Sequence, residues 1–175
     1  MKPSEISDIL ISEDAIRGRV AELGRRITED YANKELVVVG VLTGAVTFVA
    51  DLIRQLDLKI TIDFVAMSSY GASTKTSGEV RLLKDIGHPV EDVHVLVVED
   101  IIDTGLTLRY LLETIRARHP ASVETCVLLD KPSRRLVEVP VKYSGFTIED
   151  KFVVGYGLDF AGHYRNLPYI GILDQ

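Results

Sequence analysis

Cysteine is almost absent from this chain of 175 residues, which contains one, Cys126. A single cysteine cannot form an internal disulfide or a cysteine-rich metal site, and the apolar run around it predicts a small, buried hydrophobic side chain. The scarcity of cysteine fits a reducing compartment, so we expect a cytoplasmic protein. The first residues also lack the charged-then-apolar order of a signal peptide.

Long hydrophobic runs and an excess of positive charge are missing as well. The longest mostly apolar stretch, Leu36 to Ala50, is interrupted by Gly40, Thr43 and Gly44, and it is too short to cross a membrane. Acidic residues outnumber basic ones by 26 to 20, which gives a net charge of −6. Because a broad nucleic-acid surface usually needs a basic face, we expect neither a membrane protein nor a nucleic-acid-binding protein.

What remains is the composition of an ordinary globular protein, with 46% hydrophobic and 26% charged residues. The length predicts one domain, 1–175, and we find no repeat or low-complexity linker that would divide it. A helix is expected after Ser12, because apolar residues follow at spacings of three and four as far as Tyr31. Near-continuous apolar runs predict buried strands at 36–42, 60–66, 95–98 and 123–129.

The order of these segments predicts the fold class. Strand, loop, helix and strand in succession imply right-handed crossovers, so we expect an α/β fold with a mostly parallel twisted sheet flanked by helices. The small polar residues of 67–79 predict a long loop, and a loop of this length in a compact domain is typical of a lid over a site. Shorter strands are expected at 80–83, 143–148 and 152–156.

The strongest functional signal is the stretch from Val95 to Leu108. Four apolar residues lead into Glu99 and Asp100, two more apolar residues follow, and then come Asp103 and the Thr-Gly-Leu-Thr turn of 104–107. The backbone amides and hydroxyls of this turn can bind a phosphate at a helix N-terminus. The paired carboxylates can bind vicinal hydroxyls or a hard cation, and Asp103 is placed to act as a base. The stretch therefore predicts a site for a phosphorylated sugar.

Other phosphate-binding motifs fit the chain less well. The sequence contains no G-x-x-x-x-G-K-[ST], and Gly155-x-Gly157 lacks the third glycine of the dinucleotide pattern. A second candidate loop is Thr43-Gly44-Ala45, which follows the first buried strand. Ligands of parallel sheets bind at the carboxyl ends of the strands, where this loop is expected to lie.

The sequence from Val97 to Thr107 resembles the phosphoribosyl-pyrophosphate signature of the type I phosphoribosyltransferases. Its Glu-Asp-Ile-Ile-Asp-Thr-Gly form is similar to that of the hypoxanthine (hypoxanthine-guanine) phosphoribosyltransferases. The resemblance implies the type I fold, with a core of about 35–150 and a small hood formed by the N-terminal residues and about 151–175. It extends over nearly the whole chain, through Leu42-Thr43-Gly44, Ser69-Tyr70, Lys131, Phe152-Val153, Asp159 and Arg165.

The resemblance implies a division of labour within the central loop. Glu99 and Asp100 would hold the ribose hydroxyls of phosphoribosyl pyrophosphate near a Mg²⁺, and Asp103 would act as general base or acid at purine N7. The 5′-phosphate would lie in the turn of 104–107. The residues expected to bind phosphoribosyl pyrophosphate are Thr43, Gly44, Glu99, Asp100, Asp103, Thr104, Gly105, Leu106, Thr107 and Arg165.

The resemblance also implies a purine site in the C-terminal part of the chain. Lys131 would donate to O6 of the base, Phe152 would stack on the ring, and the Val153 backbone would contact its edge. Asp159 is expected at the same purine site and would ligate a second Mg²⁺, so the metal ligands expected are Glu99, Asp100 and Asp159. Ser69 and Tyr70 would belong to the lid.

The resemblance implies a magnesium-dependent transferase of purine salvage, with a purine base, phosphoribosyl pyrophosphate and pyrophosphate as its ligands. A homodimer or homotetramer is expected. The alternatives are a regulator of the same fold that senses phosphoribosyl pyrophosphate and binds nucleic acid, and a pyrimidine or adenine transferase of the same superfamily. The chain departs from the family at Thr43, where lysine is common, so the contribution of a cation to pyrophosphate binding is lost at this position. A cis Leu42–Thr43 peptide bond is expected there.

Overall fold

The computed structural model describes residues 5–70 and 79–174. Their centre is a six-stranded sheet in the order β4-β3-β2-β5-β6-β7. All its neighbouring strands are parallel except β4, which pairs antiparallel with β3. The strands are β2 (Leu36–Leu42), β3 (Ile60–Tyr70), β4 (Glu79–Lys84), β5 (His94–Ile102), β6 (Ser122–Asp130) and β7 (Tyr143–Thr147). The expectation of a mostly parallel α/β sheet is confirmed.

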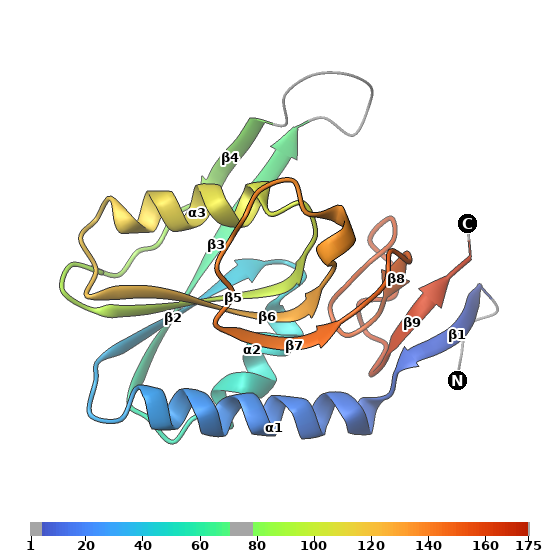
Figure 1. Cartoon of the computed structure of the whole chain (residues 1–175), viewed down its shortest axis with the longest axis horizontal. Helices are drawn as coiled ribbons and strands as arrows, with labels where there is room; N and C mark the ends of the chain where they lie inside the picture. The colour runs from blue at the N-terminus through green and yellow to red at the C-terminus, as the bar shows by residue number, and fades with distance from the viewer. Residues whose placement is uncertain (1–4, 71–78, 175) are drawn as a thin grey trace.

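Helices cover both faces of this sheet (Figure 1). On one face lie α1 (Glu13–Asp30) and α2 (Val46–Ile53), whose apolar residues pack on one side of the strands. On the other face lies α3 (Leu106–Arg116), whose buried leucines pack on the opposite side. Ser12 caps α1 by accepting a hydrogen bond from the Ala15 backbone amide, as its position predicts. None of the helices in the described ranges is long and apolar enough to cross a membrane.

The two ends of the chain meet in a second, smaller sheet with the order β1-β9-β8 (Figure 1). Its strands are β1 (Ile6–Ile11), β8 (Val153–Val154) and β9 (Ile170–Leu173), and all pair antiparallel. This sheet is the small hood that the resemblance implies. The apolar patterns predicted neither β1 nor β9, because each is short and is completed only by a partner from the other end of the chain.

Several predicted strand boundaries differ from the structure. β3 continues to Tyr70 and β4 begins at Glu79, so the predicted loop of 67–79 is shorter at both ends. The backbone pairing of the two strands extends β3 through polar residues that lack an apolar pattern. Ser69 and Tyr70, expected in a lid, are therefore the last residues of β3, and 71–78 lie outside the described residues. The strand expected at 152–156 shrinks to β8, because Gly155 and Tyr156 have positive φ angles.

Candidate active site

The carboxyl ends of β2 and β5 lie side by side, because the two strands are parallel neighbours. This arrangement brings the loop after β2 to the loop after β5, although the two are far apart in the sequence. Glu99 and Asp100 were expected where β5 ends, but they lie within it, since β5 continues to Ile102 by pairing with β6. The two loops and the last residues of β5 form the wall of a cavity of about 300 Å³.

Most of the residues expected to bind phosphoribosyl pyrophosphate line this cavity. Thr43 and Leu106 do not, although each adjoins a residue that does. Those that do are Gly44, Glu99, Asp100, Asp103, Thr104, Gly105, Thr107 and Arg165. The structure thus brings together parts of β5, both loops and the C-terminal segment.

The loop from Asp103 to Thr107 is shaped for an anion by one glycine. Gly105 has a φ of +86° and is the N-cap of α3, so the loop turns sharply and leaves the first amides of the helix without helical partners. A Cβ at Gly105 would lie 2.9 Å from the Val137 carbonyl oxygen. The Leu136 and Val137 amides donate to the Thr104 carbonyl and fix the loop from outside. The free backbone amides at this helix N-terminus are well suited to bind a phosphate.

Glu99 and Asp100 form a buried carboxylate pair. Burial raises the pKa of Glu99 well above its usual range, and the charge of Asp100 raises it further. Burial also raises the pKa of Asp100, and this is partly offset by hydrogen bonds from Glu99 and the Ile101 amide and by the charge of Arg165. Burial and the neighbouring Asp100 charge therefore both favour the protonated form of Glu99.

The loop after β2 is held in a narrow space. A Cβ added to Gly44 would overlap the Asp100 carboxylate, and a Cβ added to Gly157 would overlap the Gly44 carbonyl oxygen. Gly157 has a φ of +102°, which a side chain would oppose as well. The Leu42–Thr43 peptide bond is cis, as expected. The loop therefore lies between a strand of the central sheet and the C-terminal segment.

The C-terminal segment brings Asp159 and Arg165 to the same cavity. Arg165 Nη2 lies 2.7 Å from Asp159 Oδ1, and Arg165 Nη1 donates to the Gly157 carbonyl at 2.6 Å. The Gly162 amide donates to Asp159 Oδ2 at 2.7 Å. In the described part of the chain, no group of three or more possible protein ligands surrounds a metal position. The carboxylates at this cavity, Glu99, Asp100 and Asp159, nevertheless suit Mg²⁺, which is usually held by one or two carboxylates together with water and substrate phosphates.

A second cavity, of about 530 Å³, adjoins the first and shares Ile101, Asp103 and Asp159 with it. Lys131 is only 8% exposed, and its Nζ donates to the Lys151 carbonyl oxygen at 2.6 Å. Phe152 is 40% exposed and meets Phe160 edge to face, with ring centroids 5.6 Å apart. The cavity is lined by Ile101, Asp103, Lys131, Arg134, Asp150, Phe152, Val153, Leu158 and Asp159. It offers an aromatic face and a lysine to a planar heterocycle.

The sequence did not indicate Arg134 and Asp150, which line the second cavity, or Gly157, which packs against Gly44 of the first. Arg134 lies between two carboxylates of the second cavity. The Lys-Pro-Ser-Arg-Arg turn of 131–135 is a cationic signal in the sequence, but it does not show which of its cations face the site. Gly157 forms a Gly-x-Gly pair with Gly155, which in the sequence is no more than an incomplete dinucleotide motif.

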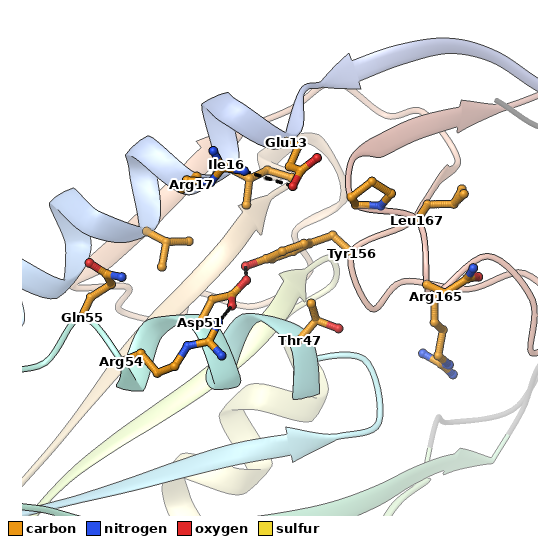
Figure 2. Close-up of a pocket in the computed structure, with 13 residues that line it drawn as sticks. Glu13, Ile16, Arg17, Thr47, Asp51, Arg54, Gln55, Tyr156, Arg165 and Leu167 are labelled. Carbon is orange, nitrogen blue, oxygen red and sulfur yellow. Dashed lines mark hydrogen bonds and ion pairs between the residues drawn. The ribbon is translucent and has the colours of Figure 1, made fainter. Parts of the chain in front are cut away.

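A larger cavity, of about 630 Å³, lies between α1, α2 and residues 165–168 (Figure 2). Tyr156 reaches across it and donates to Asp51 Oδ2 at 2.6 Å. Arg17 and Arg54, the cations on its two helices, pair with carboxylates on their own helices. The guanidinium of Arg165 points away from this cavity in Figure 2. The charged groups suited to a phosphorylated ligand therefore face the two smaller cavities.

Comparisons with known proteins agree with this geometry. Residues 5–161 match the phosphoribosyl transferase domain family. The chain is 52% identical to the hypoxanthine phosphoribosyltransferase of Haemophilus influenzae, over 94% of this chain and 93% of that protein. It is 49% identical to the hypoxanthine-guanine phosphoribosyltransferase of Bacillus subtilis, over 99% of this chain and 96% of that protein. The crystal structure of a Staphylococcus aureus hypoxanthine phosphoribosyltransferase superposes with a TM-score of 0.93 at 45% identity, over 97% of this chain and 92% of that one.

Proposed function

The chain belongs to the phosphoribosyltransferase family, and we propose that it transfers the 5-phosphoribosyl group of phosphoribosyl pyrophosphate to N9 of hypoxanthine, and of guanine, releasing pyrophosphate. The products are the purine mononucleotides IMP and GMP, so the enzyme serves purine salvage. One observation carries the proposal: the anion-binding cavity and the aromatic, lysine-containing cavity adjoin, and Asp103 lies in the wall of both. A base in one cavity can thus meet a ribose in the other.

In the first cavity, the loop of 104–107 would hold the 5′-phosphate through backbone amides and hydroxyls. Glu99 and Asp100 would accept hydrogen bonds from the ribose hydroxyls. Gly44 and Arg165 would bind the pyrophosphate. Where the family commonly has a lysine this chain has Thr43, so backbone amides of the loop would make the contact instead. These contacts fix the sugar while its anomeric carbon remains open toward the purine.

Magnesium is proposed as the cofactor, because the family uses it with phosphoribosyl pyrophosphate. When bound, it would neutralise the charge that builds on the pyrophosphate as the bond from C1′ to oxygen breaks. Glu99 and Asp100 would lie near one such ion and Asp159 near a second. Since Asp159 pairs with Arg165 in this structure, ligation by Asp159 would exchange that ion pair for a bond to the metal.

In the second cavity, Phe152 would stack on the purine and the Val153 backbone would contact its edge. Lys131 has only donors, so it would favour a 6-oxo over a 6-amino purine. As N9 bonds to C1′, the proton on N7 would pass to the Asp103 carboxylate. Exclusion of water would protect the oxocarbenium-like sugar from hydrolysis, and the expected lid, including Ser69 and Tyr70, is proposed to supply it.

The alternatives are less well supported. The relatives named above are transferases, which favours an enzyme over a regulator that senses phosphoribosyl pyrophosphate. Lys131 has hydrogen-bond donors and no acceptor, which favours hypoxanthine, with its 6-oxo group, over adenine, with its 6-amino group. We further propose that 1–175 form a single domain, with a core of about 35–150 and the hood described above. A cytoplasmic homodimer or homotetramer is proposed from the family, and light scattering of the purified protein would measure its assembly.

The decisive experiment mixes the protein with hypoxanthine, phosphoribosyl pyrophosphate and Mg²⁺ and measures IMP and pyrophosphate by chromatography. We expect both products in equal amounts, a smaller rate with adenine, and loss of turnover when a chelator removes the cation. Guanine and xanthine tested in parallel would rank the 6-oxopurines. If hypoxanthine yields no IMP, the proposed function is wrong.

A further inference from the structure

The turn after β6 contains three cations, Lys131, Arg134 and Arg135, whose side chains make different contacts. Arg135 pairs with Asp130, and both side chains are mostly buried, at 15% and 22% exposure. Lys131 lies in the wall of the second cavity, where its Nζ is 3.8 Å from Asp150 Oδ1. Arg134 lies in the same wall and also reaches Asp103, with its Nε 3.3 Å from Oδ1. The turn therefore sets one cation directly against the group proposed to accept the purine proton.

Arg134 also contacts a second carboxylate. Its Nη1 lies 3.7 Å from Asp150 Oδ2, and Asp150 precedes the segment whose Phe152 and Val153 line the same cavity. The guanidinium thus joins the loop after β5 to the segment that forms the purine wall. A planar guanidinium carries donors on several edges and can contact two carboxylates at once, whereas a lysine ammonium lacks this fixed geometry.

We propose that Arg134 is a positioning residue for the reaction proposed above, and this inference rests on that proposed function. Arg134 holds Oδ1 of Asp103, so that Oδ2 stays directed at purine N7, and Asp150 holds the guanidinium in place. N9 of the purine bonds to C1′, and the bond from C1′ to the pyrophosphate oxygen breaks with its electron pair leaving on that oxygen. The proton of N7 passes to Asp103. Proton transfer needs the acceptor within hydrogen-bond reach in a fixed orientation, which Arg134 supplies.

Stability does not account for this ion pair. The side chains of Arg134, Asp103 and Asp150 are 52%, 43% and 51% exposed. Ion pairs in such positions contribute little to folding, because water screens the charges and the side chains lose conformational entropy. Losing Arg134 should therefore change turnover much more than thermal stability. Arg135 shows the opposite case, a mostly buried pair within the turn itself.

The first test compares the wild type with Arg134→Gln, Arg134→Lys and the control Arg118→Gln. Arg118 lies past the end of α3 and pairs with Asp85 at 2.5 Å, away from both cavities. For Arg134→Gln we expect kcat to fall by about ten-fold or more, with the KM for phosphoribosyl pyrophosphate and the melting temperature unchanged. Arg134→Lys should recover part of the loss, and Arg118→Gln should match the wild type. A kcat within about two-fold of the wild type for Arg134→Gln would overturn the inference.

The second test is a double-mutant cycle with Asp103→Asn. Asp103→Asn alone should lower kcat by about 10²-fold, because the proton acceptor is lost. Adding Arg134→Gln should then change kcat by less than about two-fold, since the group that it positions is gone. If the two losses multiply instead, Arg134 acts independently of Asp103 and the inference is wrong. A wild-type protein that forms no IMP would contradict the proposed function itself, which separates that failure from failure of Arg134 alone.

Discussion

Gly44 lies directly against the Asp100 carboxylate, so closely that a Cβ added to the glycine would overlap Oδ2. Gly157 closes the other side of the same loop, against the Gly44 carbonyl oxygen. The loop after β2 therefore touches both a strand of the central sheet and the C-terminal segment. No sequence motif joins these three positions; the fold does.

Gly44→Ala should abolish most of the activity. The new methyl group must displace either the loop or the Asp100 carboxylate, and both are proposed to contact phosphoribosyl pyrophosphate. We expect kcat/KM for phosphoribosyl pyrophosphate to fall by about 10²-fold, since small misplacements of binding groups have effects of this size. Gly18→Ala is the matched control: a Cβ at this position in α1 has open space, and alanine stabilises a helix interior by about 0.5–1 kcal/mol. Equal activity of Gly44→Ala and the wild type would show that the loop can move to accommodate the methyl group without loss of substrate binding.

Glu99→Gln should make the protein more stable and inactive. Burial raises the pKa of Glu99, so the folded state keeps a proton that the unfolded state loses above about pH 4.3. The stability of the wild type therefore decreases as pH rises through this window, and the amide variant lacks that decrease. We expect the variant to gain about 1 kcal/mol at pH 8, which is about 2–4 °C in melting temperature for a protein of this size. The gain should be smaller at pH 5. Calorimetry at both pH values measures it, and a variant less stable than the wild type at pH 8 would contradict the assignment.

Lys131→Ala should weaken discrimination between hypoxanthine and adenine. Lys131 is buried at the second cavity and supplies donors only. The ratio of kcat/KM for the two bases should fall by about 10–100-fold, as expected when a charge-assisted hydrogen bond of about 1.5–3 kcal/mol is lost. Lys151→Ala is the control, because it removes a half-exposed lysine nearby and keeps the carbonyl that Lys131 contacts. If selectivity survives in Lys131→Ala, another group contacts O6.

Asp63→Asn should destabilise the fold without touching the cavities. Asp63 is 9% exposed on β3 and accepts hydrogen bonds from Lys84 Nζ, the Gly87 amide and the His88 ring, which hold the segment between β4 and β5. Burial alone would raise the pKa of Asp63, but these hydrogen bonds and that from Phe64 outweigh it and hold the pKa well below its usual range.

This network contributes stability above the unfolded pKa of about 3.9, and the contribution is lost as pH falls toward the lower folded pKa. We expect Asp63→Asn to lower the free energy of unfolding by about 2–3 kcal/mol at pH 7 and by less at pH 3. Urea unfolding at both pH values measures the difference. Asp14→Asn, at a carboxylate that is 90% exposed, is the control and should stay within about 0.5 kcal/mol of the wild type. A loss of the same size at both pH values would show that the charge of Asp63 is not what matters.

The sequence predicted best what is local. Near-continuous apolar runs predicted β2, β5 and β6 to within a few residues, because parallel strands covered on both faces favour such runs. It predicted worst what depends on a distant partner. β1 and β9 complete each other from opposite ends of the chain, and the polar end of β3 is a strand because β4 pairs with it.

The candidate site divides in the same way. The order of carboxylates, glycine and threonines from Glu99 to Thr107 predicted by itself an anion site at the start of α3, since amides, hydroxyls and a left-handed glycine are local features. Only the tertiary structure decided that Gly157 meets Gly44 and that Arg134 meets Asp103. Such contacts depend on where parallel strands end and how the hood folds back, and no periodicity along the chain carries that information.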